Sequence, residues 1–530
     1  MTRLTQCAAL ALAAVVATPV FAKTPDDTLV WAGNLDSVIT LDPAQIGEFN
    51  GAEIMLNVCD PLVRLDLDDL TKVNPGLAES WSRSADGKVL TFRLHADLKF
   101  PSGKPATAHD LAWSIQRVLN LNLANAANLR EWGFAKETAE QAFRASDDRT
   151  LVVTMDRPYP PNLILSALFS TISTFLLDRE ELLKHVKDND YGNAWLKTTS
   201  ACVGPYKVRT FNANDVVILE RNDVYYGEKP KLRRVILRHV PESGAERLQL
   251  ENGDIDVARL LNADDLLGVA ANKSIHIQPT VLHAYFYLAI NGADPILGNP
   301  KVRLALRYLV DYAGMEQTVM KNLGTPRSSL VPIGAFGALS REEGAPFRLD
   351  LDKAKQLLTE AGYPNGFSKT LMLLANTPNP ALAQHIQANA AKVGINLKLE
   401  TLPEGTLFSK HRARDFEIAL TQWFAGYPDA NAMISRHAFN PDKSLDAKLV
   451  MLPVWRSIWQ DTAINEMAET AKMEPDPQKR IAIYRTIQEK MMQDGPMVYL
   501  FQVVRSVAVR NEVKGFKMSP FHVSYGSAYK

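Results

Sequence analysis

The sequence predicts an α/β protein of more than one domain, with helices packed on the faces of β-sheets. Strand-like and helix-like hydrophobic patterns alternate along the chain, separated by turn residues. The chain has 530 residues, of which 46% are hydrophobic, whereas a single hydrophobic core stops growing at about 250–300 residues. The sequence shows no internal repeat or low-complexity tract, which excludes a solenoid.

Short alternating or apolar runs bounded by turn residues predict the strands. The clearest run follows the Asp86-Gly87 turn, where residues 88–94 alternate as in a strand that leaves a hairpin. Another, residues 416–421, leads into the stretch QWFAGYPDA at residues 422–430. The predicted strands are residues 28–32, 88–94, 206–210, 216–220, 232–239, 284–290, 397–399 and 416–421.

Apolar spacing and capping residues predict the helices. Thr107 is followed three residues later by Asp110 and then by an apolar stripe, which indicates a capped helix start. Gly362 is placed to end a helix predicted for residues 351–361. The apolar stretch 163–177, interrupted by serines and threonines, predicts a buried helix. Further helices are predicted at residues 244–250 and 302–310.

The first 22 residues have the pattern of a secretory signal peptide. Arg3 supplies the positive charge, residues 8–17 are apolar, and small residues precede a cleavage site near Ala22. The apolar run is too short for a stable membrane anchor, and no lipid-attachment motif surrounds Cys7. We therefore expect an exported, soluble protein; a buried N-terminal helix is the alternative.

Charge and cysteine content narrow the function further. The chain has 59 basic and 59 acidic residues, so no long-range field attracts nucleic acid or anionic lipid. We expect no nucleic-acid partner. Cys59 and Cys202 would remain after cleavage, and an isolated pair in an oxidising compartment is expected to form a disulfide. Two buried thiols are the alternative.

The common catalytic and metal-binding motifs are missing from the sequence. It has no GxSxG, HExxH, GxxxxGK[ST] or GxGxxG motif. Its 10 histidines are scattered, and none has metal-ligand spacing to a cysteine or another histidine. We therefore expect no catalytic residues, no metal and no cofactor. An enzyme whose site lacks a recognisable motif is the alternative.

The stretch QWFAGYPDA is the strongest candidate for a binding site. Trp423, Phe424 and Tyr427 surround a Gly-Tyr-Pro turn that holds one carboxylate, Asp429. Aromatic rings can stack on a flat ligand or on a quaternary nitrogen, and Gly426 would let a ligand approach the backbone closely. For Trp423, simple packing in a core is the alternative.

Several sequence blocks resemble the family 5 extracellular solute-binding proteins, the peptide, nickel and opine class that delivers solutes to ABC importers. Residues 75–117, PGLAESWSRSADGKVLTFRLHADLKFPSGKPATAHDLAWSIQR, are similar to the family's signature block. The others are GPY (204–206), ERNDVYYGEKPKLRRVILR (220–238), ENGDIDVA (251–258), INGADPILGNPKVRLALRYLVD (290–311) and DLDKAKQLLTEAGYPNGF (350–367). Each block alone is weak, but they stand in family order.

The resemblance implies a two-lobed periplasmic-binding-protein clamshell of the type II-like, cluster C kind, with an extra inserted small domain. Lobe I would combine residues 23–65, 200–275 and 490–530. The inserted domain would be residues 66–199, and lobe II residues 276–489. In such a clamshell the lobes close about a hinge and enclose the ligand.

The resemblance also implies ligand contacts, with one departure from the family pattern. In peptide-binding members an aspartate three residues after the matching tryptophan pairs with the ligand's ammonium, but here that position is Gly426. Asp429 could substitute by a local shift; otherwise the amine anchor is missing, and a free-amine peptide fits less well. Further candidates are His411 and Arg412 for a carboxylate or phosphate, Asn376 on a lobe II loop, and Thr40 on the lobe I loop that edges the cleft.

Together these features predict a periplasmic receptor that captures a peptide or a peptide-sized solute and delivers it to the permease subunits of an ABC importer. We expect a monomer without catalytic activity. A receptor that serves a sensor or chemoreceptor, and a hydrolase on the same fold, are the alternatives from other classes. A heme or nickel-chelate ligand is a family option that the sequence neither supports nor excludes.

Overall fold

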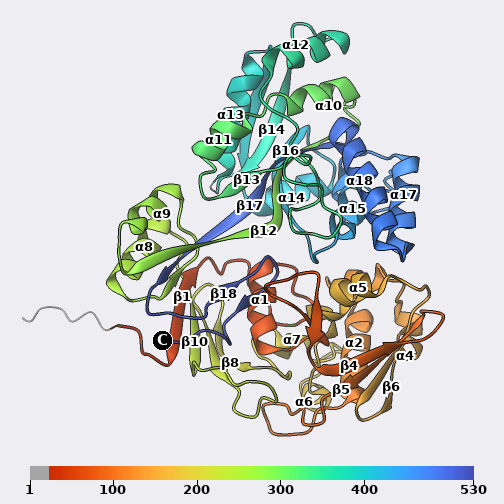
Figure 1. Cartoon of the computed structure of the whole chain (residues 1–530), viewed down its shortest axis with the longest axis vertical. Helices are drawn as coiled ribbons and strands as arrows, with labels where there is room; N and C mark the ends of the chain where they lie inside the picture. Colours follow the sequence, from red (N-terminus) through yellow and green to blue (C-terminus); the bar gives the residue numbers. More distant parts are fainter. Residues whose placement is uncertain (1–22, 377) are drawn as a thin grey trace, which may run out of the picture.

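The computed structural model describes residues 23–376 and 378–530. The chain forms two lobes, one above the other in Figure 1, which the long strands β12 (Ile275–Ile290) and β17 (Met497–Arg510) connect. Helices pack on a large mixed sheet, so the predicted α/β class is confirmed. The predicted signal peptide, residues 1–22, lies outside the described residues.

The large sheet is continuous through both lobes, in the order β15-β14-β16-β12-β17-β11-β1-β10-β9-β8, with β13 beside β17. Strands β12 and β17 are antiparallel from the pair Ile275–Arg510 to the pair Ala289–Met497, with an irregularity between Val281 and Tyr285. The other strands are β1 (Thr28–Gly33), β8 (Tyr206–Asn212), β9 (Val216–Arg221), β10 (Arg234–His239), β11 (Val257–Ala258), β13 (Gly324–Pro326), β14 (Phe367–Leu374), β15 (Ile395–Leu402) and β16 (Ile418–Phe424).

The lower lobe holds most of the first 270 residues. Its part of the large sheet packs on α1 (Phe49–Val58), and residues 66–199 build a separate four-stranded sheet beside it in the order β4-β5-β7-β6. The remaining elements of this lobe are β2 (Val63–Leu65), β3 (Val73–Pro75), β4 (Ala78–Arg83), β5 (Val89–Leu94), β6 (Phe143–Asp147), β7 (Thr150–Thr154), α8 (Ser243–Asn252), α9 (Ala263–Ala270), β18 (Lys517–Met518) and β19 (Val523–Ser524).

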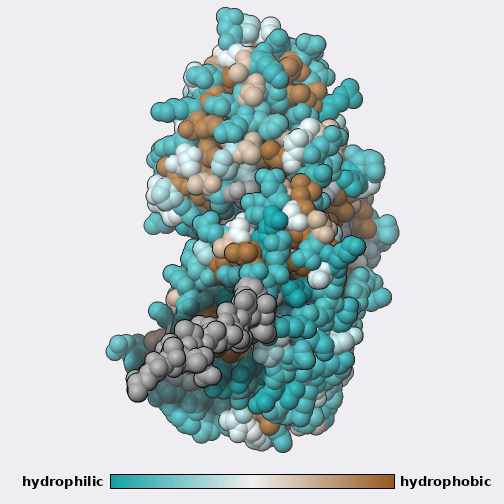
Figure 2. Space-filling model, turned by 90° about the vertical axis from the view of Figure 1, so that its left-hand side faces the viewer, coloured by the Kyte–Doolittle hydropathy of each residue, from teal (hydrophilic) through white to brown (hydrophobic). Residues whose placement is uncertain are grey.

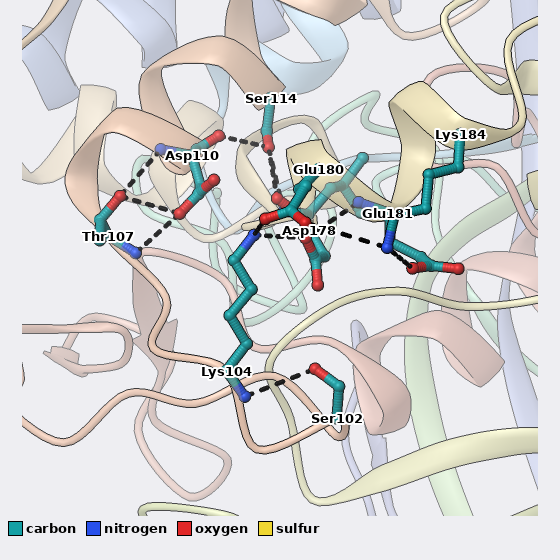
Figure 3. A network of polar contacts seen from close by, with 10 residues as sticks. Ser102, Lys104, Thr107, Asp110, Ser114, Asp178, Glu180, Glu181 and Lys184 are labelled. Atoms are coloured by element: carbon teal, nitrogen blue, oxygen red, sulfur yellow. Dashed lines mark hydrogen bonds and ion pairs between the residues drawn. The ribbon is translucent and has the colours of Figure 1, made fainter.

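Capping interactions order the helices of residues 66–199 (Figure 3). Thr107 and Asp110 form the predicted capping box of α2 (Ala108–Leu121), which confirms that prediction. Lys104 Nζ lies 3.2 Å from Asp178 and 2.9 Å from Glu180, so it links the start of α2 to that of α6. The other helices here are α3 (Ala126–Arg130), η1 (Lys136–Thr138), α4 (Ala139–Ala142), α5 (Pro161–Ile164), η2 (Leu165–Phe169), η3 (Ile172–Thr174), α6 (Arg179–Lys184) and α7 (Asn193–Leu196).

The single helix predicted for residues 163–177 is wrong. The segment is buried, as expected, but it divides into α5, the π-helical turn η2 and the short helix η3. Ser166 Oγ donates to the carbonyl of Asn162, Ser170 Oγ to that of Ser166, and Thr171 Oγ1 to that of Leu168. These side chains compete with the backbone for its carbonyl groups and interrupt the regular helix.

The upper lobe consists of strands β13 to β16 and the upper halves of β12 and β17, surrounded by helices. The predicted lobe boundary at residue 490 falls inside α18, which continues to Asp494. The helices are α10 (Pro300–Arg307), α11 (Tyr312–Gln317), α12 (Leu351–Glu360), α13 (Asn379–Ala391), α14 (Glu404–Arg412), α15 (Asn431–His437), α16 (Pro453–Arg456), α17 (Thr462–Met473) and α18 (Pro477–Asp494).

Most predicted strands and helices are present, and the largest differences are in length. The predicted strand 284–290 is only the upper part of β12, because the same strand also pairs with β17 in the lower lobe. The predicted strand 416–421 extends as β16 to Phe424, because Trp423 and Phe424 pair with Tyr285 and Ala284 of β12. The aromatic residues of QWFAGYPDA therefore begin at a strand end.

The molecular surface gives no sign of a large hydrophobic face on the side that Figure 2 shows. Hydrophobic residues there are scattered singly or in small groups over the upper lobe, among hydrophilic residues, which is common on soluble domains. Across the described residues, no helix has the length and apolar character needed to cross a membrane.

Cys59 and Cys202 form a disulfide in the structure, with their Cα atoms 5.4 Å apart and 143 residues apart in sequence. The bond joins the end of α1 to the segment just before β8. Both cysteines are buried in the core of the lower lobe.

Replacement of both cysteines by serine is expected to lower the free energy of unfolding by about 2–5 kcal/mol, because a bridge over so long a loop strongly restricts the unfolded chain. Urea unfolding with and without reductant measures the effect. Reductant should destabilise the natural protein and leave the double variant unchanged. Two free thiols in a non-reducing peptide map would contradict the bridge.

Candidate functional site

A cavity of ≈ 190 Å³ lies where the upper lobe meets residues 124–171 of the lower lobe. The upper wall comes from the end of β16 and from α15, and the lower wall from the region of α3 and from η2 and η3. The described lining residues are Ala124, Ala127, Asn128, Glu131, Trp132, Ala167, Thr171, Trp423, Phe424, Gly426, Tyr427, Ala432, Ser435, Arg436 and Met451. We call this space the aromatic cavity.

Four of the predicted site residues meet in the aromatic cavity: Trp423, Phe424, Gly426 and Tyr427. Trp423 is half-buried, and its ring lies edge-on to His437 at 5.3 Å. Phe424 reaches across the interface, because its ring lies 5.2 Å from Phe49 of α1 in the lower lobe. The contact places an aromatic pair between the lobes, where it can cover the apolar part of a ligand.

Tyr427 is held in place by polar contacts from both lobes. Its hydroxyl accepts a hydrogen bond from Asn431 Nδ2 at 2.7 Å and donates to Glu131 Oε1 at 3.4 Å. Burial and the charge of Glu131 raise its pKa well above the usual value. Tyr427 is therefore a neutral, fixed wall of the cavity.

Gly426 faces open space inside the aromatic cavity. The residue is exposed, and a Cβ added there would meet no atom within 4 Å. A side chain beginning at this position would therefore meet no steric obstacle at its Cβ. The Ser435 Oγ, which also lines the cavity, has no hydrogen-bond partner among the described residues.

Asp429 does not line the aromatic cavity and is already paired. Its carboxylate accepts from Arg480 Nη2 at 2.7 Å and from the backbone N–H of Asn431 at 2.9 Å, and the residue is 4% exposed. Burial raises the pKa of Asp429, and the Arg480 guanidinium opposes part of that shift. An ammonium at Asp429 would have to displace Arg480, which disfavours Asp429 as an amine anchor.

The other predicted contacts lie apart from the aromatic cavity and do not line it within the described ranges. His411 is 0% exposed, and burial together with Arg456 lowers its pKa to about 3, so it is neutral. Arg412 is exposed at the end of α14. Asn376 accepts from Asn379 in the turn before α13, and the buried Thr40 hydroxyl accepts from the N–H of Asp42. These four residues have local structural partners or face solvent.

Contacts around Glu131 join the lobes beside the cavity. Arg436 Nη2 of α15 lies 2.5 Å from Glu131 Oε2, and Lys472 Nζ of α17 donates to the Glu131 carbonyl at 2.8 Å. The same ammonium lies 4.8 Å from the centre of the Trp132 ring. The structure therefore shows the lobes in contact across the cavity, with partly desolvated charges at its edge.

No local sequence pattern predicted the lower-lobe residues Phe49, Glu131 and Trp132, which come from other parts of the chain. Arg505 had such a pattern: it is a charged residue in the interior of the mostly apolar strand β17, whose other charged residue, Arg510, stands at the strand end. Its guanidinium lies 4.4 Å from the centre of the Phe49 ring. Among the described residues, no group of three or more His, Cys, Asp or Glu side chains is placed to hold a metal ion.

Comparison with known proteins identifies the family. The family model described as "Bacterial extracellular solute-binding proteins, family 5 Middle" matches residues 72–444, which is most of the chain. The chain is a family 5 solute-binding protein. The resemblance noted in its sequence blocks is thereby confirmed, and the two-lobed clamshell is the fold of its structural relatives.

Relatives of this solute-binding protein cover nearly its whole length. The probable D,D-dipeptide-binding periplasmic protein DdpA of Escherichia coli K12 is 28% identical over 96% of this chain and 95% of its own. The structure of DppA from Helicobacter pylori with the peptide STSA matches with a TM-score of 0.77 at 24% identity, covering 95% of this chain and 98% of that one. MoaA from A. tumefacien R10, in complex with mannopinic acid, matches with a TM-score of 0.79 at 23% identity, covering 95% and 99%.

The variant Asp429→Asn is expected to lower the free energy of unfolding by about 3–5 kcal/mol, because it leaves the buried Arg480 without a charged partner. Urea unfolding of the ligand-free protein measures the loss. Glu343→Gln is the matched control. It removes the exposed partner of Arg485, which lies on α18 as Arg480 does, and should change stability little. If Asp429→Asn were no worse than the control and abolished solute binding, Asp429 would be a ligand contact.

Proposed function

We propose that this protein is the periplasmic substrate-binding protein of an ABC importer, which captures a peptide or a peptide-sized solute between its lobes and delivers it to the membrane permease. The observation that carries the proposal is the aromatic cavity, whose walls come from both lobes and whose Phe424 contacts Phe49 across the interface. A cavity formed by two lobes can open and close around a ligand. The protein works as a monomer and catalyses no reaction.

Export to the periplasm is supported by two features of this chain. Residues 1–22 have the pattern of a signal peptide that is cleaved near Ala22. The disulfide between Cys59 and Cys202 suits an oxidising compartment. DdpA, which resembles this chain along almost its full length, is a probable periplasmic protein.

The lobes are assigned as residues 23–65, 200–275 and about 495–530 for lobe I and residues 276 to about 494 for lobe II, with residues 66–199 as the inserted domain. The shift from residue 490 keeps α18 intact. Strands β12 and β17 form the hinge, since they connect the lobes in Figure 1. The pair Glu131–Arg436 supports the closed arrangement.

The ligand contacts we propose are Trp423, Phe424, Gly426 and Tyr427. Relatives differ in what they hold: DppA from H. pylori was solved with a peptide and MoaA with mannopinic acid. Because the carboxylate is missing at Gly426, a ligand whose amine is anchored as in the peptide-binding members fits less well.

Native mass spectrometry of the protein purified from its own periplasm tests the proposal. Release under denaturing conditions should yield a small solute, since a closed cavity retains its ligand during purification. A heterogeneous set of short peptides would identify a peptide receptor, and a single other mass a dedicated solute receptor. If no solute were retained, the protein would be unfolded to remove any ligand, refolded, and mixed with a periplasmic extract. Failure to bind any solute from that extract would refute the receptor function.

Gly426→Asp is expected to create or strengthen binding of free-amine dipeptides and tripeptides. The new carboxylate fits the open space at Gly426 and would pair with the peptide ammonium, an interaction worth about 1.5–3 kcal/mol. Calorimetry compares both proteins, with Gly426→Asn as the uncharged control of similar size. If aspartate gave no gain over asparagine, the anchor would lie elsewhere in the cleft.

A further inference from the structure

Two ionisable side chains near the interface of the lobes have buried atoms without a hydrogen-bond partner among the described residues. They are Arg505, through Nη1, and Glu48, through Oε1; the unpaired imidazole nitrogens of His283 and His437 belong to rings that burial keeps neutral. Buried polar atoms are nearly always hydrogen-bonded in native proteins, because loss of solvation without a new partner costs free energy. A pair of such groups, one basic and one acidic, can take a partner from outside the chain.

Arg505 lies on the strand pair that connects the lobes, opposite Thr280 of β12. Its guanidinium rests on the Phe49 ring, 4.4 Å from the ring centre. Arg327, another buried arginine, instead donates to the backbone carbonyls of Val331, Leu339 and Ser340. Arg505 makes no comparable contact with any part of the chain that the structure describes, so its guanidinium is available to an anion.

Glu53 is the carboxylate whose charge acts on Arg505, and it is already occupied by other partners. Glu53 accepts from Arg259 Nη1 at 2.6 Å and Nη2 at 2.8 Å, and from the Tyr525 hydroxyl at 2.6 Å. Burial, together with repulsion from Arg259, lowers the pKa of Arg505 to about 10, so it stays charged at neutral pH. Glu53 is thus committed to Arg259, and Arg505 forms no ion pair with a carboxylate among the described residues.

Glu48 lies immediately before Phe49, at the start of α1. Its Oε2 accepts from the N–H of Gly51 at 2.7 Å, but Oε1 is unpaired. Burial raises the pKa of Glu48 to about 7. The preceding residue, Gly47, lies against Ala124, since a Cβ added there would be 3.8 Å from the Ala124 Cβ. Ala124 lines the aromatic cavity, so Glu48 lies near its lower-lobe edge.

We propose that the ligand is a zwitterion whose carboxylate binds Arg505 and whose protonated amine binds Glu48. The inference rests on the proposed receptor function and adds to it the charged groups that the ligand carries. The two residues flank Phe49, which would cover the apolar part between the charges together with Phe424. A ligand with one charge would satisfy one of these groups and leave the other unpaired. The amine anchor missing at Gly426 is thus supplied by the opposite lobe.

The test uses the variants Arg505→Gln and Glu48→Gln of the full-length mature protein. The probes are the dipeptide Met-Leu and mannopinic acid, which both carry an amine and a carboxylate. Each variant is expected to bind the recognised probe about 10- to 100-fold more weakly, because each loses a charged hydrogen bond. Arg341→Gln, which changes an exposed arginine paired with Glu316, is the matched control and should bind as the natural protein does.

Stability measurements separate binding from folding. Arg505 has no hydrogen-bond partner among the described residues and would lose only its contact with the Phe49 ring, so Arg505→Gln should unfold at close to the urea concentration of the natural protein. Glu48→Gln keeps an oxygen that can accept from Gly51. A variant that lost both binding and stability would show that the residue has a structural partner, which contradicts the proposal.

Blocked probes assign each end of the ligand. If Met-Leu is the recognised probe, N-acetylation should weaken binding to the natural protein and to Arg505→Gln, but not to Glu48→Gln; amidation of the carboxyl end should show the converse pattern. For mannopinic acid, the N-acetyl and methyl-ester derivatives take these roles. Equal losses in all three proteins would overturn the assignment.

The remaining outcomes distinguish this inference from the proposed function. If neither probe binds while the released natural solute lacks an amine or a carboxylate, the ligand is not a zwitterion and only this inference fails. If the released solute has both an amine and a carboxylate, it is used in place of the probes. Its affinity for Arg505→Gln and Glu48→Gln then tests the inference. If no solute is retained or bound at all, the receptor function fails as well.

Discussion

The antiparallel pairing of β12 with β17 is the interaction on which the rest of the structure depends. The two strands form hydrogen bonds with each other's backbone groups as they pass from one lobe to the other. The backbone of this connection is therefore paired where it leaves each lobe. Strand β16 pairs with the upper part of β12, which carries Trp423 and Phe424 to the interface. Arg505 lies on β17 itself. The irregular register between Val281 and Tyr285 lies in the middle of this pair, where fewer regular bonds resist a change in the angle between the lobes.

The interface of the lobes combines neutral walls with few charges. Burial lowers the pKa of His283 to about 3, and His437 is likewise shifted well below its usual value, so neither ring carries charge at neutral pH. The aromatic rings of Trp132, Trp423, Phe424 and Tyr427 form further parts of the wall. In such surroundings a single unpaired charge interacts more strongly than it would in water. Recognition would then depend on matching a small number of ligand charges, whereas the aromatic walls accept many shapes.

Local sequence patterns predicted what is local in the structure and missed what is assembled from distant segments. The Thr107 capping box and the strands near Asp86-Gly87 depend on neighbouring residues, and they are present. Trp423 to Tyr427 share a cavity because they adjoin in sequence. Residues 163–177 failed as one helix because serine and threonine hydroxyls bind the helix carbonyls. Glu131 and Phe49 reach the site through folding alone, which no spacing in the sequence reveals.

The disulfide between Cys59 and Cys202 also determines how the chain is connected. It joins the end of α1 to the segment just before β8, 143 residues further along the chain, and closes the chain between them into a ring. The domain of residues 66–199 is therefore a side branch of the lower lobe, because the two flanking segments are linked without it. A single cut anywhere in that branch would leave one covalent molecule, in which lobe, hinge and cleft remain attached to one another.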